Sequence, residues 1–153
     1  MKFFNQKKKY SLRKHIHRFM FSNAFLNGYF CTNIASMNYK VPYDFVLRHL
    51  YPVRPKIKKM LGCYALIDNH KILFLLRERD NQPEFNGVFV ATQPEYYDQL
   101  EQEIHASSME FNIDGLHHSY LFLSEDLDDF DEKIKKVCDM IKAGDERIGK
   151  SNG

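Results

Sequence analysis

Two apolar runs separated by a short polar turn constrain the fold more than any other feature of this 153-residue sequence. The first run covers residues 60–67, the second covers residues 72–78, and Asp68-Asn69-His70-Lys71 lies between them. Asp and Asn tolerate the left-handed backbone conformations that a tight turn between antiparallel strands requires. The sequence therefore predicts a β-hairpin at this point.

Helical patterns lie on both sides of the hairpin. Pro42 suits the first turn of a short helix over residues 42–50. A second helix is expected to start at Thr92-Gln-Pro-Glu95, a capping-box pattern in which the hydroxyl and the carboxylate satisfy the first free N–H groups. A third is expected to start at Asp129 and to stop at Gly144. Its apolar residues recur at helical spacing: Phe130, Ile134, Val137, Cys138 and Ile141.

Three further strands complete the predicted fold. Residues 88–91 form one strand, and residues 110–113 and 119–123 form two more around Gly115. The basic segment over residues 54–59 is interpreted as a linker before the hairpin. Adjacent strands joined by short turns favour an antiparallel sheet. The sequence thus predicts an α+β, two-layer domain of order α-β-β-β-α-β-β-α with its helices on one side.

The composition changes abruptly after residue 36. Residues 1–36 contain seven Lys or Arg and no Asp or Glu. Such a segment is typical of a secretion or targeting signal, of a basic aromatic arm for a membrane surface or nucleic acid, or of sequence upstream of the true start. We favour the last interpretation, because Met37 opens directly onto the first well-formed element. We therefore expect a disordered basic leader over residues 1–36 and one α+β domain over residues 37–153.

The first strand of the hairpin carries a family resemblance. Its residues Lys59-Met60-Leu61-Gly62-Cys63-Tyr64-Ala65-Leu66, followed by the polar turn, resemble the TfoX N-terminal-domain and MmcQ/YjbR-like families. Leu61 stands where those families have Phe. The resemblance covers roughly residues 37–145 and implies a secretion-chaperone-like α+β fold. It also implies a link to competence regulation or to DNA binding, and it brings no catalytic residues.

The residues that could carry chemistry predict no enzyme. The glycine spacing fits neither G-x-G-x-x-G nor a phosphate loop, so we expect no cofactor. Cys31, Cys63 and Cys138 lack C-x-x-C spacing, which favours a reducing cytoplasm, with the last two as small core hydrophobes. His117-His118 would point to opposite faces of a strand, and the acidic run over residues 125–132 does not fit an EF-hand loop. We therefore expect no catalytic residues and no metal.

Charge is distributed unevenly along the predicted domain. Residues 37–80 carry nine Lys or Arg against four Asp or Glu, whereas residues 81–153 carry six against sixteen. The candidate contact residues are Arg48, Arg54, Lys56, Lys58, Lys59, Arg77 and Arg79. This polarity favours binding of a protein partner or of a second copy of the chain. The alternative is weak DNA binding through Arg54 to Lys59 with Arg77 and Arg79, which salt would weaken. No apolar run reaches the ~20 residues of a membrane span.

Overall fold

The computed structural model describes three stretches of the chain, residues 40–60, 62–113 and 116–151. The chain divides into two units, and every described residue belongs to the second, over residues 37–153. The predicted leader over residues 1–36 lies outside the described residues.

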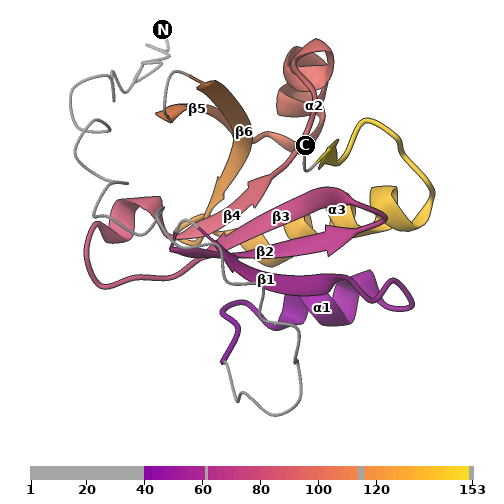
Figure 1. The fold of residues 1–153 in the computed structure, drawn as a ribbon. Helices are drawn as coiled ribbons and strands as arrows, with labels where there is room; N and C mark the ends of the chain where they lie inside the picture. Colours follow the sequence, from indigo (N-terminus) through magenta and orange to yellow (C-terminus); the bar gives the residue numbers. More distant parts are fainter. Residues whose placement is uncertain (1–39, 61, 114–115, 152–153) are drawn as a thin grey trace, which may run out of the picture. The chain divides into compact units, whose positions relative to one another are not determined.

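One antiparallel sheet organises the described part of the chain (Figure 1). Its strands follow the order β1-β2-β3-β4-β6-β5, and β7 pairs with β3. Because β2 pairs along one side of β3, β4 and β7 share the other side. The strands are β1 (Lys56–Met60), β2 (Cys63–Asp68), β3 (Lys71–Arg77), β4 (Gly87–Val90), β5 (Ser107–Ile113), β6 (Leu116–Ser124) and β7 (Lys150–Ser151).

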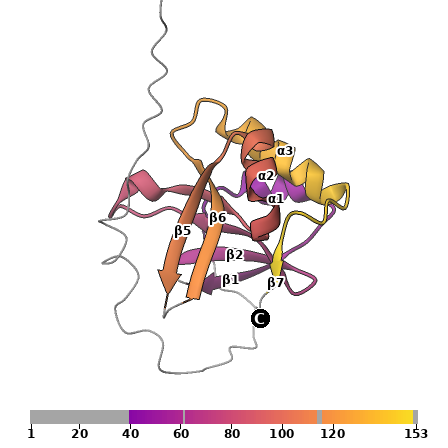
Figure 2. The same cartoon turned by 90° about the horizontal axis from the view of Figure 1, so that it is seen from above.

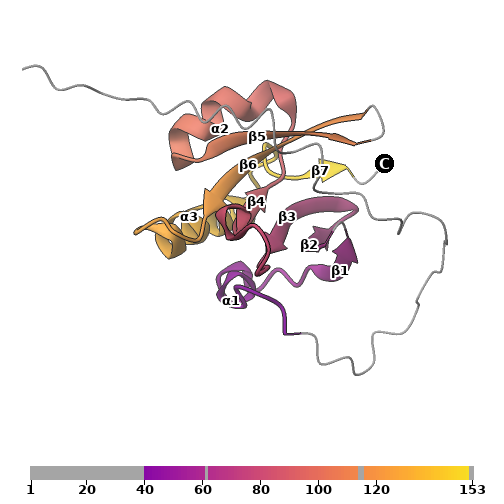
Figure 3. The same ribbon diagram turned by 90° about the vertical axis from the view of Figure 1, so that its left-hand side faces the viewer.

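Three helices gather on the same side of the sheet (Figures 2 and 3). They are α1 (Phe45–Leu50), α2 (Tyr97–Ile104) and α3 (Phe130–Lys142), and two short 3-10 helices, η3 (Pro83–Phe85) and η4 (Pro94–Tyr96), flank β4. Helices and sheet share one buried core, whose members include Val46, Leu66, Phe74, Val90, Leu100, Leu121, Ile134 and Val137. The prediction of an α+β domain with an antiparallel sheet is therefore confirmed.

The predicted hairpin is formed by β2 and β3. Asn69 and His70 make its two-residue turn with φ of 46° and 63°, in the left-handed region. Turns of this kind match the right-handed twist of the strands they join. Leu66 pairs with Phe74 across the hairpin, and both side chains are fully buried. The turn pairs Asp68 with Lys71 and Ile67 with Ile72, and a β-bulge between Leu66 and Ile67 then moves the register by one residue, so that Leu66 meets Phe74.

The predicted linker over residues 54–59 is wrong, because most of it is strand β1. β1 pairs with β2 from Lys56↔Ile67 to Met60↔Cys63. Ile57 is half-buried and packs against the core, whereas the flanking lysines are exposed. This alternation is that of a strand with one solvated face. Lys59 takes the position where this alternation needs an apolar residue, so the sequence pattern is too weak to show the strand.

The predicted capping box at residues 92–95 is also wrong. Thr92 is fully buried, and its hydroxyl donates a hydrogen bond to the carbonyl oxygen of Arg147. Thr92 also forms an isolated bridge with Ile148. η4 follows and leads into α2, and neither helix has a side-chain cap. A contact with the C-terminal segment therefore takes the hydroxyl that the local pattern assigns to the helix.

The end of α3 is as predicted. Gly144 has a φ of 79°, in the left-handed region. Its N–H donates to the carbonyl of Ile141 at 3.0 Å, and the N–H of Asp145 donates to the carbonyl of Met140 at 3.0 Å. These two bonds form a Schellman motif, which satisfies the last free carbonyls of the helix.

The C-terminal segment beyond α3, for which the sequence predicts no structure, is tied back to the domain. The N–H of Gly149 donates to the carbonyl of Ala91 at 2.7 Å. Arg147 forms ion pairs with Asp145 at 2.6 Å and with Glu103 of α2 at 2.9 Å. This segment therefore links the end of β4 to α2 and to β3.

We expect Arg147→Ala to lower the free energy of unfolding by about 1 kcal/mol at neutral pH. The hydrogen bond from Arg147 holds the pKa of Asp145 below its usual range. This contribution is therefore present above about pH 4 and is lost as the pH falls through the lowered pKa. Urea unfolding of both proteins at pH 7 and near pH 2 measures the difference. Arg48→Ala, which removes an exposed pair with Asp44, is the matched control, and an Arg147→Ala deficit unchanged near pH 2 would contradict the prediction.

Candidate functional site

A row of exposed basic side chains follows the edge strand β1. Arg54, Lys56, Lys58 and Lys59 are all exposed. Tyr51, the C-cap residue of α1, has 64% of its surface exposed. Among the described residues it is the one large hydrophobic side chain that is exposed. We call these five residues the basic edge.

Each side chain of the basic edge is placed by its position on the backbone. Strand alternation puts Lys56 and Lys58 on one face of the sheet and Lys59 on the other. The Nζ of Lys59 lies 5.8 Å from the ring centre of Tyr64 in β2. The Cζ of Arg54 lies 5.9 Å from the ring centre of Tyr51. These cation–π contacts orient the cations and leave their charge uncompensated.

Among the described residues, no carboxylate forms an ion pair with a cation of the basic edge. Within the described residues, no Asp or Glu oxygen lies within 4.0 Å of a charged nitrogen of its arginine or lysines. Ion pairs in the described part instead occur on α1, on α3 and around Arg147. The basic edge therefore presents positive charge to solvent.

The other candidates of the first half differ in their surroundings. Arg79 is exposed, and its Nη1 lies 2.6 Å from the position that a Cβ on Gly62 would occupy. Arg79 therefore lies against the turn between β1 and β2 and extends the basic edge at that end. Arg48 is exposed on α1, but its Nη1 donates to the Oδ2 of Asp44 at 2.7 Å. Its charge is thus paired.

Arg77 lies inside the protein, with 3% of its surface exposed. Its Nη1 donates to the carbonyl of Gln82 at 3.1 Å and to the Oδ1 of Asn86 at 2.7 Å. Its Nη2 donates to the carbonyl of Asn81 at 3.0 Å, and its Cζ lies 6.0 Å from the ring centre of Phe85. Burial lowers the pKa of this guanidinium. Arg77 thus holds the loop before β4 in place. Its burial distinguishes it from the candidates that are exposed on the surface.

We expect Arg77→Ala to destabilise the fold by about 2–3 kcal/mol, because it removes three hydrogen bonds of a charged group and the buried side chain that packs against Phe85. Arg79→Ala removes the same chemical group two residues further along, from an exposed position. It should change the free energy of unfolding by no more than about 0.5 kcal/mol. Urea unfolding of both variants at neutral pH measures the contrast, and equal effects would refute the distinction between the two arginines.

The cysteines of the described residues lie in the interior. Burial raises the pKa of the Cys63 thiol to about 11 and that of the Cys138 thiol to about 12. Both thiols are therefore protonated at neutral pH and suit the predicted role as small core hydrophobes. Cys31 lies outside the described residues, and the side chain of His117 is likewise not described. Within the described residues, no group of three potential metal ligands is close enough to hold an ion.

The acidic run over residues 125–132, which lies before and within α3, contacts α1 and the residue Tyr43 that precedes α1. Glu125 accepts a hydrogen bond of 2.6 Å from the hydroxyl of Tyr43. Burial and this bond raise the pKa of Tyr43. The Oδ1 of Asp131 lies 2.6 Å from the Nε2 of His49. These carboxylates join α1 to α3, which is a structural use of the run.

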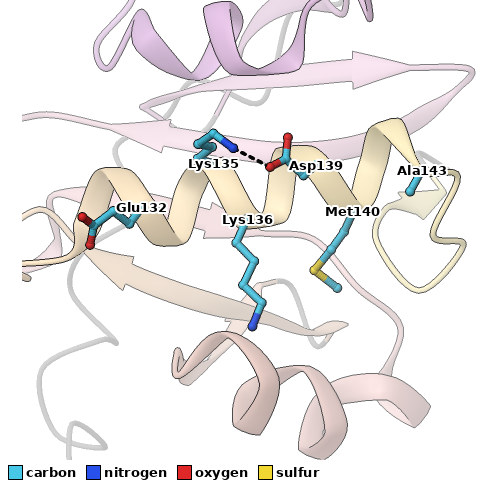
Figure 4. A pocket seen from close by; sticks show the side chains of 6 residues that line it. All are labelled: Glu132, Lys135, Lys136, Asp139, Met140 and Ala143. Carbon is cyan, nitrogen blue, oxygen red and sulfur yellow. Dashed lines mark hydrogen bonds and ion pairs between the residues drawn. The ribbon is translucent and has the colours of Figure 1, made fainter.

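A shallow depression of about 430 Å³ lies on the surface of α3 (Figure 4). Lys135 donates to Asp139 at 2.7 Å beside it, so two of its charges pair with each other. Ligand sites usually gather polar groups from several elements, whereas the lining residues of this depression come from α3 and its C-cap residue: Glu132, Lys135, Lys136, Asp139, Met140 and Ala143. It therefore gives no reason to expect catalysis. No helix in the described part has the length and apolar character needed to cross a bilayer.

Comparison with protein-family models, with curated proteins and with solved structures gives no match. The resemblance to the TfoX and YjbR-like families therefore rests on residues 59–66 and stays a hypothesis. In the structure this segment spans the end of β1, the turn at Gly62 and the start of β2.

Tyr51 is the residue of this surface that sequence reasoning missed. It follows the apolar stripe of α1 directly and precedes Pro52 and the basic segment. An aromatic residue at a helix end, next to a run of cations, is the signal that could have shown it.

Proposed function

We propose that this protein is a non-enzymatic interaction module that binds another protein, or a second copy of itself, through the basic edge. The observation that carries the proposal is the uncompensated charge of Arg54, Lys56 and Lys58 beside the exposed ring of Tyr51. Tyr and Arg are enriched in protein interfaces and at their energetic centres. Complementary charge sets the choice of partner and the rate of association.

The proposed absence of catalysis is supported by where the titratable groups lie. Active sites bring groups with shifted pKa values together in a cleft. Here the pKa values of Cys63, Cys138 and Tyr43 are raised chiefly by burial, and none of the three lines the depression on α3. The two buried thiols also suit a reducing compartment, and on that ground we propose that the protein works in the cytoplasm.

Weak DNA binding through the same surface, extended by Arg79, is the alternative. It is favoured by three lysines on one exposed strand, which could each meet a phosphate. Against it, the remainder of the domain is strongly acidic, and the sequence pI is about 8.3, whereas DNA-binding domains usually exceed about 9. We therefore favour a protein partner.

A photo-crosslinking amino acid, p-benzoylphenylalanine, replaces Tyr51 in the full chain, at an exposed position where the added benzoyl group meets solvent. In cells that express this variant, we expect a protein adduct of discrete mass after illumination. Lys56→Glu/Lys58→Glu should reduce its yield by about tenfold or more, because like charges in an interface cost several kcal/mol. Denaturing gels and mass spectrometry measure the adduct. An adduct at twice the 18.2 kDa mass of the chain would identify a second copy as the partner.

The matched control places the same photo-crosslinker at Lys135, on the exposed face of α3. It should give no discrete adduct that depends on the lysines of β1. Equal adducts from both positions, or none from Tyr51, would refute the basic edge as a protein-binding surface.

Duplex DNA tests the alternative directly. The full chain is titrated into labelled duplex at low and at near-physiological salt. We expect no binding tighter than the non-specific range of about 10⁻⁴–10⁻⁶ M. Binding tighter than about 10⁻⁶ M that falls steeply with salt and weakens in Lys58→Ala/Lys59→Ala would make DNA the partner.

A further inference from the structure

The sheet ends at β1, and this edge is open in the described part of the chain. β1 pairs with β2 alone, and no other described backbone group bonds to it. In an antiparallel pair, every second residue of an outer strand directs its N–H and C=O groups away from its neighbour. β1 therefore offers unpaired donors and acceptors along five residues, or about 16 Å.

The opposite end of the sheet differs. There β5 is the outer strand. The N–H of Ser108 donates to the Oε1 of Glu101 at 3.2 Å, so a side chain of α2 already uses a backbone group of β5. The two outer strands therefore do not offer the same opportunity for pairing.

We infer that β1 accepts an extended acidic peptide segment of a partner protein as an added strand. This inference rests on the proposed function, and it names the mode of binding and the chemistry of the partner. Backbone hydrogen bonds would supply part of the affinity, as in other cases of strand addition. Because side chains of a strand alternate, carboxylates at every second residue would face Lys56 and Lys58.

Charge decides between an acidic segment and a second copy of the chain. Two β1 strands paired with each other would bring lysines opposite or next to lysines, which is destabilising. Edge lysines are a common means of preventing unwanted strand pairing. Such an edge rejects basic and apolar strands and admits a strand of opposite charge, so the same residues give selectivity.

The surroundings of β1 extend this complementarity beyond the strand. Arg54 precedes β1, and Arg79 lies against the turn that follows it. The ring of Tyr51, covered on one side by Arg54, is available to an apolar side chain near one end of the peptide. Cations on β1 and on the segments next to it, together with one aromatic anchor, thus border the open edge.

The test uses the full chain and two labelled nonapeptides, Ser-Val-Glu-Val-Glu-Val-Glu-Val-Ser and its counterpart with Gln for each Glu. Fluorescence anisotropy measures affinity, and amide hydrogen exchange by NMR reports on β1. We expect the Glu peptide to bind at least about tenfold more tightly than the Gln peptide. Alternate amides of Lys56–Met60 should exchange at least about tenfold more slowly in its presence.

Charge variants supply the matched controls. Lys56→Glu/Lys58→Glu should weaken binding of the Glu peptide by about tenfold or more. Lys135→Glu/Lys142→Glu makes the same change of charge on α3 and should alter affinity by less than about twofold. Thermal melting of each variant shows that the fold is kept.

The outcomes separate this inference from the proposed function. Binding that depends on the lysines but leaves the β1 amides unprotected would overturn strand addition and leave the basic edge as an interaction surface. Absence of Glu-peptide binding would overturn the acidic partner, with the crosslink at Tyr51 still deciding whether the surface binds a protein. Binding of duplex DNA in place of the peptide would overturn both.

Discussion

β3 is the strand on which the rest of the sheet is aligned. β2 pairs along one side of it, and β4 and β7 share the other. Phe74, in its middle, is fully buried between Leu66 and Val90 of the neighbouring strands. Because side chains alternate, a shift of one residue in β3 would exchange the two faces against three strands at once. The two-residue turn at Asn69-His70 sets the register of the pairs next to it, and the β-bulge between Leu66 and Ile67 resets it by one residue before Leu66 and Phe74 pair.

The elements that could be predicted from the sequence are those whose signals are complete within a few residues. The hairpin turn and the stop at Gly144 each need only a residue that tolerates the left-handed region. The elements that could not be predicted depend on distant partners. Thr92 carries a good capping pattern, yet its hydroxyl meets Arg147, which only the folded chain brings near. β7 is two residues long and exists because β3 has room for it beside β4.

The candidate site was predictable in part. Charge along the sequence indicates which segment is basic, but it does not show which of its side chains are exposed. The excess of cations over residues 37–80 drew attention to the correct segment. It could not separate Arg77 from Arg79, because the difference arises from the loop that closes over the first and leaves the second exposed. Nor could it show that three lysines share one edge strand, since their charge concealed the strand pattern. The tertiary fold determines exposure, and exposure distinguishes the buried Arg77 from the exposed Arg79.

The two ends of the sheet show how the protection of an edge bears on function. A backbone group already bonded by another element, as Ser108 is by Glu101, is unavailable to any incoming strand, whatever its sequence. An edge protected by charge is closed to strands of like charge and open to strands of opposite charge. Lysines on β1 therefore cannot be judged protective or functional from their charge alone. What distinguishes β1 is the exposed ring of Tyr51 beside it, because a solvated aromatic side chain does nothing to protect an edge and adds contact area for a bound segment.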